Sequence, residues 1–108
     1  MHTYGLVIYL KDEPHVISEY KKFHTSVWPK VKSDLIDLGV NKMKIFLFES
    51  TLFMYMEASE DFDFSLLANA SEETEDWNKL MSTLQVPVRD VKRGEWWYQL
   101  EKVYDLQW

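Results

Sequence analysis

The sequence predicts an α+β fold in which one antiparallel sheet packs against helices, with the element order βαββαβ. Four segments are rich in β-branched and aromatic residues, which is typical of strands. Two longer segments place apolar residues at steps of three and four, which is typical of helices. A chain of 108 residues has room for one hydrophobic core, so we expect a single domain spanning 1–108.

The N-terminal third of the chain predicts one strand and one interrupted helix. The strand covers 3–10, and the helix starts with an acidic first turn beside Pro14. The apolar face of this helix consists of Val16, Tyr20, Phe23, Val27, Val31, Leu35 and Leu38. Because Pro29 has no N–H to donate, we expect a kink or a restart there, with Thr25 or Ser26 as the new N-cap.

A hairpin follows the helix. Gly39 lies where a helix C-terminus favours a left-handed residue. Strands are predicted over 42–48 and 52–57, joined by a tight turn at 49–51. These signals place the second and third strands side by side.

The second helical segment covers 62–84, with a possible break around Ala70 and Ser71. Ser71 is a favourable N-cap, and the acidic residues in 72–76 suit the positive end of a helix. We therefore interpret this acidic run as a solvated helix start.

The C-terminal segment predicts the last strand. Pro87 and Gly94 bound a loop before it, and 96–108 then alternates between apolar and mostly polar residues, with Lys102 as the exception. The apolar positions are Trp96, Tyr98, Leu100, Tyr104, Leu106 and Trp108.

The order βαββαβ is that of a ferredoxin-like fold, with a four-stranded antiparallel sheet and both helical segments on one face. A sheet whose other face met water would alternate between apolar and polar residues, but these strands are apolar on both sides. We expect a second subunit to cover that face, which makes the protein a homodimer.

Composition excludes several function classes. The net charge of −6 makes nucleic acid an unlikely partner, and the absence of cysteine excludes thiolate catalysis and Cys-ligated metals. No glycine-rich phosphate-binding motif is present, and the three histidines lack metal-ligand spacing. With no apolar stretch long enough for a bilayer and no signal-peptide pattern, we expect a cytoplasmic protein with no membrane partner.

One constellation is more specific. Tyr20, His24 and Trp28 are spaced i, i+4 and i+8, so a continuous helix would place them on roughly one face. An imidazole exchanges protons near neutral pH, and its aromatic neighbours suit a flat ligand such as a sugar. Spacing alone favours a half-buried histidine with an ordinary hydrogen bond.

Residues 19–29, E-Y-K-K-F-H-T-S-V-W-P, resemble the E-Y-x-x-x-H-x-x-[IV]-W-P signature of the L-rhamnose mutarotases. Further segments resemble the family in the same order along nearly the whole chain. They are Gly39, 45–47, 52–57, 77–81 and 100–104.

This resemblance implies a dimeric α/β barrel that interconverts the α and β anomers of a 6-deoxy hexose, with no metal and no cofactor. It assigns the catalytic histidine to His24, a substrate-contacting tyrosine to Tyr20 and a stacking tryptophan to Trp77. Two substrate-binding positions depart from the family: its second tryptophan is Asn78 here, and a second-strand tyrosine is Met43. L-Rhamnose is thus the first expected substrate and L-fucose the next.

Mutarotation opens the sugar ring by removing a proton from the anomeric hydroxyl and delivering one to the ring oxygen, which general acid–base catalysis accelerates. Two alternatives stay open. The chain could be a non-catalytic sugar-binding or sensing domain, since Asn78 and Met43 depart from the family, or a cofactor-independent oxygenase or haem-degrading enzyme of the same fold.

Overall fold

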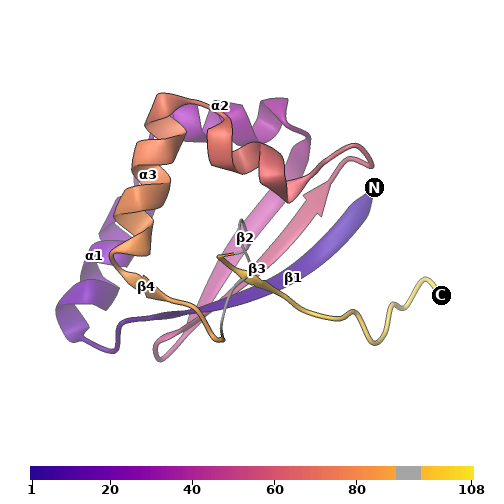
Figure 1. Ribbon diagram of the computed structural model, residues 1–108. Helices are drawn as coiled ribbons and strands as arrows, with labels where there is room; N and C mark the ends of the chain where they lie inside the picture. Colours follow the sequence, from indigo (N-terminus) through magenta and orange to yellow (C-terminus); the bar gives the residue numbers. More distant parts are fainter. Residues whose placement is uncertain (90–95) are drawn as a thin grey trace.

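A computed structural model describes residues 1–89 and 96–108 of the chain. Its sheet has five strands, and three α-helices and a 3-10 helix lie on one side of it (Figure 1). The elements in chain order are β1 (His2–Leu10), α1 (Pro14–His24), α2 (Pro29–Asp37), β2 (Val40–Phe48), β3 (Thr51–Ala58), η1 (Phe64–Asn69), α3 (Glu72–Ser82), β4 (Gln85–Val86) and β5 (Tyr98–Gln99).

The sheet has the order β2-β3-β1-β4, and β5 also pairs with β1. All of its pairs are antiparallel. The two short strands share one edge of β1: β4 pairs with Tyr9 and Leu10, and β5 pairs with Leu6 and Val7. Together they occupy the position of the fourth strand, so the predicted ferredoxin-like α+β fold is confirmed.

The prediction of a long last strand is wrong. Only Tyr98–Gln99 are strand, and the chain beyond them runs away from the helices (Figure 1). One more backbone bond extends the pairing, from Leu100 N to Gly5 O at 2.7 Å. Residues 101–108, beyond this bond, form no strand pairing with the described part of the chain. Their alternating apolar residues therefore do not extend the sheet. Gly94, predicted to bound the preceding loop, lies outside the described residues.

The interrupted helix is confirmed as two helices, but the expected N-caps are wrong. The cap of α2 is Trp28, directly before Pro29, and neither Thr25 nor Ser26 takes this position. The indole of Trp28 has no oxygen to accept from the N–H groups of the first turn, so α2 starts without a capping side chain, and Pro29 supplies a φ that suits a helix start. The expected acidic first turn of α1 is also absent, because the acidic pair precedes Pro14.

The predictions for Gly39, the hairpin turn and the start of the last helix are confirmed. Gly39 has a φ of 107° after α2, and Glu49 turns the hairpin with a φ of 54°. The break before α3 is present, and the Ser71 side chain caps this helix by accepting from Thr74 N.

The core lies between the helices and the facing side of the sheet. Leu6, Ile8 and Leu10 of β1 point into it and are almost fully buried. The opposite face of the sheet is apolar and open in the single chain: Phe48 is 73% exposed and Phe53 is 39% exposed. None of the helices in the described ranges has the length and apolar character that a membrane span requires.

Candidate active site

His24 is the last residue of α1 and is half-buried. Its Nδ1 lies 2.8 Å from the carbonyl oxygen of Tyr20, one helical turn earlier. A carbonyl oxygen only accepts, so in this bond Nδ1 carries the proton. The neutral imidazole therefore has its lone pair on Nε2, where it can accept a proton.

Tyr20 stacks on this imidazole. The two ring centroids are 4.2 Å apart and the planes differ by 25°. The Tyr20 side chain is only 4% exposed, and this burial raises the pKa of its hydroxyl to about 12, against the opposing effect of a hydrogen-bonding contact with the Gln85 side chain. The hydroxyl thus keeps its proton at neutral pH and remains a donor.

Trp77 of α3 packs against the same imidazole edge to face, with centroids 5.4 Å apart and planes at 68°. Its indole also meets Trp28 at 5.2 Å and Phe23 at 6.3 Å, both nearly perpendicular. These are favourable aromatic geometries. The turn at 25–28 thus brings Trp28 to the cluster, although it does not belong to the helix that carries His24.

A cavity of about 240 Å³ opens beside this cluster, between the end of α1 and the hairpin. Its lining residues are Tyr20, Lys21, His24, Thr25, Ile45, Phe46, Leu47 and Leu52. The hairpin contributes an apolar wall, and α1 contributes the groups that can exchange protons. The prediction that Trp77 stacks on the sugar stays a prediction, because Trp77 reaches His24 but does not line this cavity.

Gln85 is a polar residue of the site that sequence reasoning missed. Its side chain is 5% exposed, and its Oε1 accepts a hydrogen bond from Trp96 Nε1 at 2.8 Å. An indole N–H only donates, so the carboxamide turns its oxygen to Trp96 and keeps its N–H groups for the Tyr20 side. No local pattern marks Gln85, which lies on a two-residue strand.

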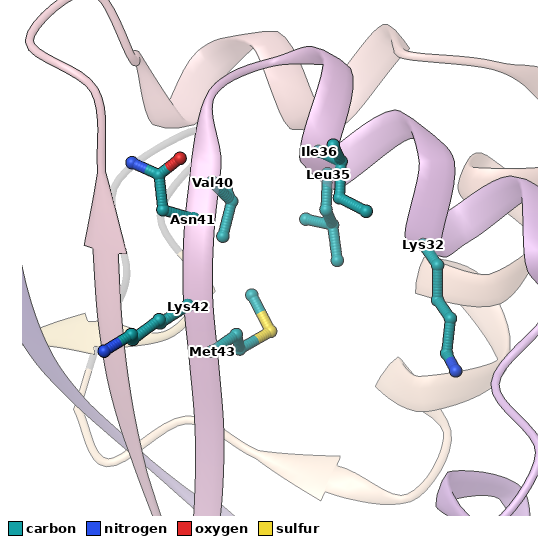
Figure 2. Close-up of a pocket in the computed structure, with 7 residues that line it drawn as sticks. All are labelled: Lys32, Leu35, Ile36, Val40, Asn41, Lys42 and Met43. Atoms are coloured by element: carbon teal, nitrogen blue, oxygen red, sulfur yellow. The ribbon is translucent and has the colours of Figure 1, made fainter.

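Met43 and Asn78, the two positions that differ from the family pattern, lie elsewhere. Met43 faces Leu35 across a separate cavity of about 170 Å³ between α2 and β2, shown in Figure 2. Asn78 is exposed on α3 and lines neither cavity. The structure thus brings together Tyr20, His24 and Trp77, and it leaves these two positions apart from them.

The fold and the site define a ferredoxin-like protein with one tautomer-fixed histidine in an apolar cavity, an arrangement suited to acid–base isomerisation. A family model described as L-rhamnose mutarotase matches residues 3–106. The chain therefore belongs to the L-rhamnose mutarotase family and is an isomerase that acts on sugars.

Two curated relatives are similar over most of their length. A UPF0734 protein of Dictyostelium discoideum is 38% identical over 98% of this chain and 90% of its own. An L-fucose mutarotase of Xanthomonas campestris pv. campestris is 29% identical over 93% of this chain and 84% of its own.

Solved structures agree with the fold. The L-rhamnose mutarotase FA22100 of Formosa agariphila superposes with a TM-score of 0.74 and 25% identity, over 98% of this chain and 99% of that one. The tetracenomycin F2 cyclase of Streptomyces glaucescens superposes with a TM-score of 0.60 and 17% identity, over 97% of this chain and 96% of that one. At this identity the likeness is one of fold alone.

Proposed function

We propose that this chain interconverts the α and β anomers of a 6-deoxy hexose, with L-rhamnose as the first substrate and L-fucose as the next, and that it needs no cofactor. The observation that carries the proposal is the hydrogen bond from His24 Nδ1 to the carbonyl of Tyr20. It leaves a free basic nitrogen beside a protonated phenol at the edge of a sugar-sized cavity.

The proton steps follow from these two groups. Nε2 of His24 takes the proton of the anomeric hydroxyl, whose O–H electrons form the aldehyde C=O as the bond from C1 to the ring oxygen breaks. The ring oxygen gains a proton, which the Tyr20 hydroxyl delivers directly or through a water. The aldehyde then rotates about C1–C2, and the same steps in reverse close the ring. General acid–base help of this kind contributes about 10²–10⁴-fold.

The apolar wall of the cavity supports the choice of a 6-deoxy sugar. Ile45, Leu47 and Leu52 offer no hydrogen bond to a 6-hydroxyl, and a methyl group at C6 fits such a surface. Burying a hydroxyl without a partner costs on the order of 1–3 kcal/mol. We expect sugars that carry the 6-hydroxyl to exchange more slowly.

The open face of the sheet supports a homodimer as the working form. Phe46, Phe53 and Tyr9 form an exposed apolar surface on the side opposite to the helices. A second copy that packs sheet on sheet would remove this surface from water.

The proposal is tested by exchange NMR between anomers for a matched panel of sugars. We expect faster exchange with L-rhamnose and L-fucose than with their 6-hydroxy counterparts L-mannose and L-galactose. Calorimetry with the same sugars tests the alternative of a non-catalytic sensing domain. Binding of a sugar without faster anomer exchange would indicate such a domain and contradict the proposal.

A further inference from the structure

A buried carboxylate lies at the junction of α2 and α3, away from the cavity. Asp34 of α2 is 5% exposed and accepts three hydrogen bonds. The donors are the hydroxyls of Ser71 and Thr74, the latter at 2.6 Å, and the ammonium of Lys30 at 2.9 Å. These bonds satisfy a charge that would otherwise be costly to bury, and they hold the pKa of Asp34 at about 2, so the carboxylate is ionised at neutral pH.

The two hydroxyls belong to the first turn of α3. Ser71 is the N-cap, and its Oγ accepts from Thr74 N at 3.1 Å while it donates to Asp34. Thr74 donates to the same carboxylate oxygen. Asp34 therefore fixes both the cap and the following turn of α3 to α2.

The same face of α3 carries the aromatic support of the site. Thr74 and Trp77 are both buried and lie three residues apart, so they project from one face in successive turns. Trp77 meets the imidazole of His24 at 5.4 Å. His24 ends α1, and the short segment 25–28 joins α1 to α2, so the attachment of α3 to α2 also bears on where the Trp77 indole meets the imidazole.

We propose that Asp34 is a positioning residue, which holds α3 through Ser71 and Thr74 so that Trp77 orients the His24 ring. The inference rests on the proposed function for its kinetic part only. Nothing in the sequence marks Asp34, which sits on a short helix that has no residue in the cavity.

The test compares Asp34→Asn with Asp37→Asn, which makes the same chemical change at an exposed position of the same helix. We expect kcat for anomer exchange to fall about tenfold in Asp34→Asn with KM within a factor of two, because a small displacement of a catalytic group is costly. We also expect the indole resonance of Trp77 and the ring-nitrogen resonances of His24 to shift in this variant only.

A double-mutant cycle shows whether the effect passes through Trp77. In a Trp77→Phe background, Asp34→Asn should add little to the loss of kcat. A full additional tenfold loss there would overturn the proposal. So would resonances and kinetics of Asp34→Asn that match those of Asp37→Asn.

Thr74 provides a milder pair of variants for the case in which Asp34→Asn does not fold. Thr74→Val removes the donor and Thr74→Ser keeps it, so the first should shift the Trp77 and His24 resonances and the second should restore them. If the wild type catalyses no exchange, the proposed function fails, and the same resonances still decide the positioning role. Equal resonances in Thr74→Val and the wild type would contradict it.

Discussion

At the scale of single residues, the backbone of α1 selects the chemistry of His24. The carbonyl of Tyr20 takes the Nδ1 proton, so the basic nitrogen is Nε2. In the proposed mechanism, the buried hydroxyl of Tyr20 is the donor that complements this base. One residue thus contributes its backbone to the histidine and its side chain to the cavity.

Tyr20 also predicts a pH dependence of stability. Its pKa is raised from 10.0 to about 12, so between these values the unfolded chain loses the proton before the folded one, and stability falls as pH rises. The loss is roughly 1.4 kcal/mol at pH 11 relative to neutral pH. Urea unfolding from pH 8 to 11 should show this slope in the wild type and lose it in Tyr20→Phe. A slope in Tyr20→Phe as steep as in the wild type would contradict the assignment.

The residues of the site differ in how far the sequence could predict them. Tyr20, His24 and Trp28 share one spacing pattern, whereas Trp77 is indicated only by the family resemblance. Gln85 and Asp34 could not be predicted, because each is a buried polar residue whose partners lie on other elements: Trp96 for the first, Ser71 and Thr74 for the second. Such pairings leave no local pattern.

At the scale of elements, local signals predicted most boundaries. Pro29 begins α2, Ser71 caps α3, and Gly39 ends the helical region. The prediction of a long C-terminal strand was wrong because alternation describes which way side chains point and not whether a neighbouring strand is present. In the described part of the chain, 101–108 have no strand to pair with. Strand length depends on an available neighbour, which a single sequence does not show.

Gly39 gives an element-level prediction. Its φ of 107° is unfavourable for other residues, and a Cβ there would lie 2.3 Å from Ser59 Oγ. Gly39→Ala should therefore lower the free energy of unfolding by about 1–3 kcal/mol, as measured by urea denaturation. Adding Ser59→Gly should recover part of the loss, because it removes the contact and leaves the backbone strain. No loss in Gly39→Ala would contradict this account of the turn from α2 to β2.

At the scale of the whole molecule, the sheet separates two surfaces. One face builds the core and the site, and the other exposes Phe48 and Phe53. The last residues add further exposed apolar side chains, with Tyr104 at 68% and Trp108 at 77%. So much exposed apolar surface in a small protein indicates a surface for assembly.

A charge on the open face should separate the subunits of the proposed homodimer. Phe53→Glu is expected to halve the mass in sedimentation at micromolar protein, because the carboxylate would be buried without a partner. Ile36→Glu is the control, since Ile36 is also apolar and is 68% exposed, against 39% for Phe53, but lies on a helix. A wild-type mass equal to that of the monomer would contradict the homodimer.

In the proposed mechanism, one histidine moves the protons of mutarotation. The most direct measurement is the rate of anomer exchange of L-rhamnose by NMR at neutral pH for the wild type, His24→Ala and His15→Ala, where His15 is an exposed histidine of the same helix. We expect His15→Ala to keep the wild-type rate and His24→Ala to lose about 10²-fold or more. Equal rates in His24→Ala and the wild type would contradict this mechanism.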